Sequence, residues 1–123
     1  MNEMQTFLGK IGEAYACDYL KKQGLRIRTK NFHSAFGEID IVAMDQKTLV
    51  FVEVKLRKST DHGSPFEFIS PWKQKRIRKT AEFYLLRYHL KNIPCRFDAI
   101  GIVGDVKGDE IDVVSIEWLR DAF

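Results

Sequence analysis

The sequence is poor in cysteine, in long apolar runs and in the features of a targeting segment, and each shortage excludes a class of protein. Two cysteines, Cys17 and Cys95, are too few for a disulfide framework, and neither has a metal-type partner nearby in the chain. No apolar run approaches the roughly 20 residues of a membrane-spanning helix. The N-terminal residues 1–5 lack the basic and apolar regions of a signal peptide. We therefore expect a cytoplasmic protein with reduced thiols and no membrane partner.

The composition is that of a soluble globular protein, with 45% hydrophobic and 30% charged residues. Its 123 residues suffice for one domain with a sizeable core, which we expect to span residues 1–123. The spacing of apolar and turn-forming residues predicts a mixed α/β domain with the order α-β-β-β-α-β-β. The expected helices cover about residues 4–22 and 71–92, with a short helical turn at 118–123; the expected strands cover 25–32, 38–44, 48–56, 97–103 and 111–116.

The first expected helix has two different sides. Apolar side chains at helical spacing, from Phe7 through Tyr19, predict that one side packs on a core. The opposite side carries Gly9 and Gly12, small residues that would let a neighbouring backbone or a ligand approach closely. Glu13 projects from this small-residue side, either into a site or as a solvent-facing charge.

Acidic side chains and a lysine stand on two adjacent apolar segments that are typical of a β-hairpin. Alternation along each strand sends Glu38 and Asp40 to one face, and it also sends Glu53 and Lys55 to one face. If the polar turn at residues 45–48 forms a loop of even length, Asp40 lies across from Glu53, and Glu38 across from Lys55; an odd loop would separate the two carboxylates. Because like charges opposite each other destabilise a sheet, a divalent metal between Asp40 and Glu53 would resolve the conflict.

The chemistry of such a site follows from its ligands. Mg²⁺ prefers hard oxygen donors, here the two carboxylates and a strand carbonyl such as that of Val54, with Mn²⁺ as an alternative ion. A metal in this position lowers the pKa of bound water and neutralises charge on a scissile phosphate. Lys55 would orient the attacking water or stabilise the charged transition state. Glu13 would complete the metal site or bind a second ion.

Longer motifs surround these residues: Gly9-x-x-Gly12-Glu13, Gly37-Glu38-Ile39-Asp40-Ile41-Val42, Phe51-Val52-Glu53-Val54-Lys55-x-Arg57 and Pro71-x-Lys73-Gln74. Over almost the whole chain, and in the expected order, they closely resemble the YraN-like family of small bacterial proteins. Asp40 followed by Glu53-Val54-Lys55 is also similar to the PD-(D/E)xK motif of the restriction-endonuclease-like superfamily, although Ile39 stands where that motif has proline.

The resemblance implies a restriction-endonuclease-like fold, with a mixed central β-sheet flanked by helices, and a nuclease similar to archaeal Holliday junction resolvases. It implies metal roles for Glu13, Asp40 and Glu53, and a catalytic role for Lys55. Because resolvases cut two strands symmetrically, it also implies a homodimer.

The positive charge lies directly after the carboxylate hairpin. Residues 55–79 carry eight basic and two acidic side chains, whereas the flanking segments carry no positive excess. A basic segment beside an acidic cluster is typical of a polyanion held over metal ions, although a solvated helix face is the alternative. The candidates for contacts with nucleic acid are Arg57, Lys58, Lys73, Gln74, Lys75, Arg76, Arg78 and Lys79.

Several further residues allow two interpretations. Glu38 is either an outer partner of Lys55 or an exposed strand residue, and Gln74 is either beside the site or an ordinary surface glutamine. Trp72 either stacks on a base or packs in the core, and the second interpretation is preferred. Asp98 is expected to be structural or exposed.

The leading hypothesis is a metal-dependent endonuclease that hydrolyses phosphodiester bonds of DNA, including branched or structured DNA. Its main alternative is a non-catalytic nucleic-acid-binding or partner-binding module on the same fold. A hydrolase of smaller phosphoesters is a third interpretation, which the length of the basic segment disfavours.

Overall fold

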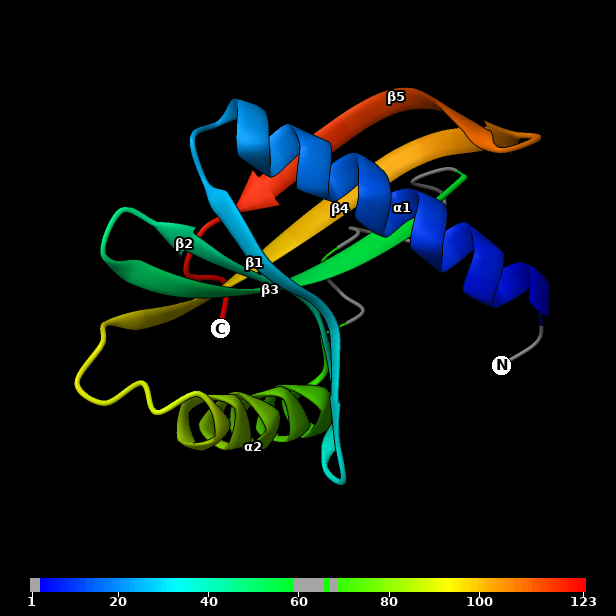
Figure 1. Cartoon of the computed structure of the whole chain (residues 1–123). Coiled ribbons are helices and arrows are strands. Elements are labelled where there is room, and N and C mark those ends of the chain that lie inside the picture. The colour runs from blue at the N-terminus through cyan, green and yellow to red at the C-terminus, as the bar shows by residue number, and fades with distance from the viewer. Residues whose placement is uncertain (1–2, 59–65, 67–68) are drawn as a thin grey trace.

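A five-stranded mixed sheet forms the middle layer of the protein, with one helix on each face (Figure 1). The computed structural model describes residues 3–58, 66 and 69–123, and the side chains from residue 7 onward within these ranges. The sheet has the order β1-β2-β3-β4-β5, in which β3 and β4 are parallel and the other neighbours are antiparallel. The elements are α1 (Glu3–Lys22), β1 (Arg26–Ser34), β2 (Gly37–Asp45), β3 (Thr48–Arg57), α2 (Pro71–Arg87), β4 (Cys95–Lys107) and β5 (Glu110–Leu119).

The element order agrees with the prediction, but the C-terminal end does not. A helical turn was expected at residues 118–123, whereas β5 continues through Leu119 and pairs Trp118 with Ile100. The Trp118 ring meets the ring of Tyr19 edge-on at 6.3 Å, so packing beneath α1 holds this segment extended. The second helix also ends earlier than expected, at Arg87.

Two apolar cores lie on opposite faces of the sheet because β2, β3 and β4 are buried on both sides. Even-numbered residues of β3, such as Val50 and Val52, face α1, and odd-numbered residues, such as Leu49 and Phe51, face α2. The near-continuous apolar sequences of these strands reflect this double burial. Among the described residues, no helix is both long and apolar enough to cross a membrane.

The small-residue side of α1 lies closest to the sheet, and part of the apolar side packs beside it, with Tyr15 against the core and Tyr19 on Trp118. Gly12, Ala16 and Leu20 are buried at successive turns, whereas Phe7 is 43% exposed. A Cβ atom on Gly12 would stand 3.3 Å from the Cβ atom of Leu56 in β3, so the small-residue side brings α1 close to the sheet. That close approach also carries Glu13 to the edge of the sheet.

A buried polar network joins the start of β4 to the C-terminus. Asp98 is fully buried and accepts hydrogen bonds from Arg96 Nε at 3.0 Å, Trp118 Nε1 at 2.9 Å and the backbone N–H of Asp121 at 2.9 Å. Arg96 also donates to Asp45 at 2.9 Å, at the end of β2. The role of Asp98 is therefore structural, one of the two roles expected from the sequence.

Replacing Asp98 with alanine should lower the free energy of unfolding by roughly 3–5 kcal/mol, because it leaves the Arg96 charge and the Trp118 N–H without their buried acceptor. Urea denaturation followed by circular dichroism measures this change. Asp112→Ala is the matched control, since Asp112 is an exposed residue of β5 and its loss should change stability by no more than about 0.5 kcal/mol. Equal effects of the two substitutions would contradict the assignment.

Candidate functional site

The hairpin of β2 and β3 has a loop of even length, the condition on which the expected site depended, and its two strands separate at the acidic residues. Asp45 pairs with Thr48 around a two-residue loop, and the pairing continues as far as Ile41 with Val52. Beyond that pair, the backbone N–H of Val54 donates a 2.8 Å hydrogen bond to Oδ2 of Asp40. The Asp40 side chain thus provides the acceptor for the backbone of β3 at this point.

The expected pairing of Glu38 with Lys55 across the hairpin is not observed. Glu38 instead pairs with His33 of β1, and the His33 Nδ1 and Glu38 Oε2 atoms are 3.2 Å apart. Its side chain is 50% exposed, which supports the interpretation of Glu38 as an exposed strand residue rather than a partner of Lys55. The ladder pairing of β2 with β3 stops before Glu38, so the hairpin geometry that would align it with Lys55 does not extend that far.

A pocket of about 1250 Å³ lies where β2 and β3 separate. Its walls come from α1, from the β1–β2 hairpin, from the last residues of β3 and from the first turns of α2. Glu13, Asp40, Glu53 and Lys55, the residues predicted to carry the chemistry, all line this one pocket. Figure 1 shows that α1 and α2 cover opposite faces of the sheet and that the β1–β2 hairpin extends beside α2.

Glu53 is the most deeply buried acidic residue of the pocket, at 4% exposure. Burial raises the pKa of its carboxyl to about 8, and the charge of Asp40 adds to this rise. Lys73 of α2 opposes it, with Nζ 3.4 Å from Oε2 of Glu53. The other oxygen, Oε1, is buried and has no hydrogen-bond partner among the described residues.

Glu13 and Asp40 form a second interacting pair. Burial raises the pKa of Glu13 to about 7, the Asp40 charge adds to the rise, and a hydrogen bond from the Asn31 side chain opposes it. The pKa of Asp40 is also raised by burial, against the effects of the Val54 N–H and of the Lys73 charge. A hydrogen bond from protonated Glu13 to the Asp40 carboxylate raises the pKa of Glu13 further and opposes the rise at Asp40.

The donor chemistry of the pocket fits a hard divalent cation. Carboxylate oxygens are the ligands that Mg²⁺ and Mn²⁺ prefer, and Oε1 of Glu53 is a buried oxygen without a donor. In the described part of the chain, however, no three acidic, histidine or cysteine side chains stand close enough together to hold an ion. Lys73 offsets part of the acidic charge through its pair with Glu53.

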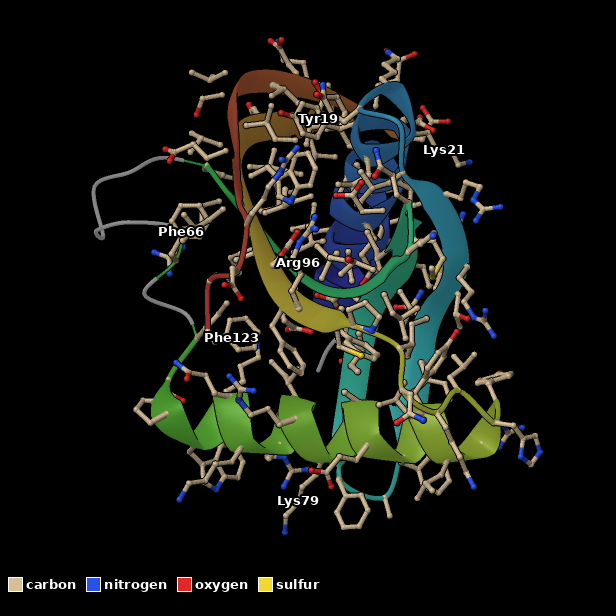
Figure 2. The ribbon with its side chains drawn as sticks, turned by 90° about the vertical axis from the view of Figure 1, so that its left-hand side faces the viewer. Tyr19, Lys21, Phe66, Lys79, Arg96 and Phe123 are labelled. Carbon is tan, nitrogen blue, oxygen red and sulfur yellow. The ribbon has the colours of Figure 1, made fainter. Side chains whose placement is uncertain are left out.

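The basic residues expected to contact nucleic acid occupy several positions. Lys73 and Arg76 line the pocket, whereas Lys79 points away from the sheet on the outer side of α2 (Figure 2). Gln74 donates to the carbonyl of Ile69 at 3.3 Å, so it secures the segment before α2. Of the remaining candidates, Arg57 is half-buried, Lys58 and Lys75 are exposed, and Arg78 lies over the ring of Phe97 at 4.7 Å.

Sequence reasoning missed the counter-ion of Glu53 and the partner of Glu13. Lys73 was assigned only to nucleic acid, and Asn31 was not considered. The Pro71-x-Lys73 pattern could have indicated the role of Lys73, because it places this lysine in the first turn of a helix that packs near β3. Asn31 has a left-handed backbone (φ 53°), which a sequence alone does not reveal for asparagine.

Together these features define a small mixed α/β protein with a buried acidic pocket and a basic helix at its rim. The chain belongs to the uncharacterised protein family UPF0102, whose family model matches residues 12–102. UPF0102 is the YraN-like family, so this part of the resemblance drawn from the motifs is confirmed.

Three curated relatives illustrate the similarity. A UPF0102 protein of Colwellia psychrerythraea is 42% identical over 99% of this chain and 92% of its own length. One from Chlorobium limicola is 44% identical over 94% of this chain and 91% of its own. One from Persephonella marina is 50% identical over 79% of this chain and 84% of its own.

Proposed function

We propose that this protein is a metal-dependent endonuclease on a restriction-endonuclease-like fold, which acts in the cytoplasm and hydrolyses phosphodiester bonds in DNA, including branched or structured DNA. One observation carries the proposal: carboxylates from three separate elements, together with Lys55, line a single pocket at the point where β2 leaves β3. Ionisation of Glu13, Asp40 and Glu53 together is unfavourable without a cation, and burial accordingly raises the pKa of each.

The residues of the pocket have distinct roles in this mechanism. A bound Mg²⁺ or Mn²⁺ supplies positive charge at the scissile phosphate and lowers the pKa of water. Asp40 and Glu53 would hold it, and Glu13 would complete the set only if the three carboxylates came closer together than they stand here. Lys55 is exposed at the end of β3, on the α2 face with Glu53, where its charge can stabilise the negative transition state or orient the water.

The first turns of α2 provide the surface for the DNA backbone. The segment 71–79 carries five basic residues and no acidic residue, and it begins at the rim of the acidic pocket. Contacts between these side chains and phosphates position the substrate without selecting a base sequence. Two copies of the chain arranged about a two-fold axis would suit symmetric cleavage of a junction.

The test is cleavage of end-labelled linear, flapped and four-way-junction DNA by the purified protein with Mg²⁺ or Mn²⁺. We expect product that disappears with a chelator and that Asp40→Ala abolishes, because this substitution removes a central acidic ligand. Thermal denaturation of both proteins is the control that tests whether Asp40→Ala remains folded. Product that persists in the folded Asp40→Ala protein would refute the proposed site.

A non-catalytic nucleic-acid-binding module is the second candidate. The observations in its favour are that Lys73 already pairs with Glu53, and that no three acidic, histidine or cysteine side chains of the described residues stand close enough together to hold an ion. This candidate predicts that DNA binds equally well with and without divalent ions, and that no ion yields product. Metal-dependent product from any of the three substrates would exclude it.

A further inference from the structure

Trp72 occupies a position that the sequence did not predict. Core packing was the preferred interpretation of this residue, and it is wrong, because Trp72 is 67% exposed in the first turn of α2. Ser70 caps this helix by accepting a hydrogen bond from the backbone N–H of Lys73, and Pro71 starts it, so the position of the ring is set by an ordered helix end. Trp72 also lines the pocket that holds Asp40.

Arg76, one turn further along α2, is paired with this ring. The centre of its guanidinium lies 4.8 Å from the centroid of the Trp72 ring, within the range of a cation–π contact. On its other side, Arg76 approaches the β1–β2 hairpin, where its Nε atom is 3.7 Å from the position that a Cβ atom on Gly37 would take. Gly37 has a φ of +146°, so a side chain there would be strained, although its Cβ atom would meet Arg76 at an ordinary contact distance. The Trp72–Arg76 pair thus stands on α2 and lies next to the β1–β2 hairpin.

The surroundings of this pair specify the chemistry of its ligand. A large exposed aromatic ring is unfavourable in water, and here it is flanked by Lys73, Lys75 and Arg76. Such a surface matches a ligand with a flat apolar face and a chain of negative charges. A nucleic-acid strand has both, but bases inside a duplex have their faces covered by stacking, so only an unpaired base can reach the ring.

We propose that Trp72, with Arg76 beside it, is a stacking platform for an unpaired base of the strand that enters the acidic pocket. The inference rests on the proposed function and narrows its substrate class to DNA with unpaired bases next to the cleaved bond. The bases of a flap or of an open junction meet this requirement, and those of a blunt duplex do not.

The test compares two labelled probes of equal length, a blunt duplex and a duplex with a single-stranded flap, in buffer with a chelator so that no cleavage occurs. Fluorescence anisotropy should show that Trp72→Ala weakens binding of the flapped probe by about tenfold or more and leaves the duplex unchanged. Trp72→Phe, which keeps a ring, should retain most of the affinity. Leu86→Ala is the matched control, because Leu86 is 73% exposed on the same helix, and it should affect neither probe.

Intrinsic fluorescence gives a second readout that depends on stacking itself. Binding of the flapped probe should quench the tryptophan fluorescence of the wild-type protein, and this quenching should be lost in Trp72→Phe. The other tryptophan, Trp118, should not respond, because it is hydrogen-bonded to the buried Asp98. Equal weakening of both probes by Trp72→Ala, or no weakening of either, would overturn the platform while leaving the endonuclease proposal intact. A wild-type protein that binds neither probe in the chelator, and cleaves neither with Mg²⁺ or Mn²⁺, would overturn both.

Discussion

At pH 8 and without divalent ions, the Glu53→Gln protein is expected to be more stable than the wild type. Glu53 is buried, and its pKa rises from the usual value of 4.5 to about 8. Folding therefore works against ionisation of this carboxyl, while glutamine has nearly the same shape and carries no charge. The difference in the free energy of unfolding should be on the order of a few kcal/mol, measured by urea denaturation.

The sign of the pH dependence follows from the direction of the shift. Because the pKa of Glu53 is higher in the folded state, its contribution to stability is fully present below pH 4.5 and is lost as the pH rises toward 8. The advantage of Glu53→Gln should accordingly be absent near pH 4.5 and largest at pH 8. Glu82→Gln, at an exposed position of α2, is the matched control and should show no such trend. A constant difference at every pH would contradict the assignment.

The same pair of proteins separates a metal site from a purely structural acidic pocket. Mg²⁺ binds the folded state only, so at pH 8 it should raise the unfolding midpoint of the wild-type protein. It should raise that of Glu53→Gln much less, because the neutral amide is a poorer ligand for a hard cation. If Mg²⁺ stabilises both proteins equally, Glu53 is not a metal ligand.

Lys55→Ala is expected to lower the rate of DNA cleavage by about 10²–10³-fold, the typical loss when one group that stabilises transition-state charge is removed. Lys55 is exposed at the end of β3, and its removal leaves the cores and the carboxylates in place. The affinity for uncleaved DNA should therefore change little. Single-turnover cleavage, measured beside binding in a chelator, separates the two quantities.

Two other lysines serve as comparisons for Lys55. Lys75→Ala removes an exposed lysine of α2, and it should only weaken binding and reduce its salt dependence. Lys73→Ala removes the charge beside Glu53, so the pKa of Glu53 should rise further. If Lys73→Ala abolishes cleavage at saturating metal while Lys55→Ala does not, the catalytic lysine is the one on the helix.

The sequence was informative where local patterns determine structure. The alternation in the two strands predicted that a loop of even length would bring Asp40 and Glu53 to the same end of the hairpin, and the structure has such a loop. The small-residue side of α1 indicated that Glu13 could approach the sheet, and the structure places Glu13 in the pocket. These features depend on residues that are close in the chain or on the strict two-residue period of a strand.

Features that depend on how the helices pack were not predictable in the same way. The pairing of Lys73 with Glu53 joins residues twenty positions apart and arises only once α2 lies against β3. Apolar spacing did not reveal that the Gly12 side of α1 lies closest to the sheet, because that position depends on a close approach that bulky residues prevent. At the C-terminus, packing under Tyr19 overrode the expected helical turn at Trp118.

The two halves of the pocket differ in how firmly they are anchored. Glu53 and Lys55 lie on a central strand that is paired with β4 along its length, Glu53 with Ala99 and Lys55 with Gly101. Trp72 and Arg76 stand on the first turns of a helix and reach the rim through long side chains. Substitutions in the first turns of α2 can alter which nucleic acid is bound, because they leave Glu53 in its place on β3. Selectivity for the substrate can therefore change through residues of α2, while the positions of Glu53 and Lys55 on β3 stay the same.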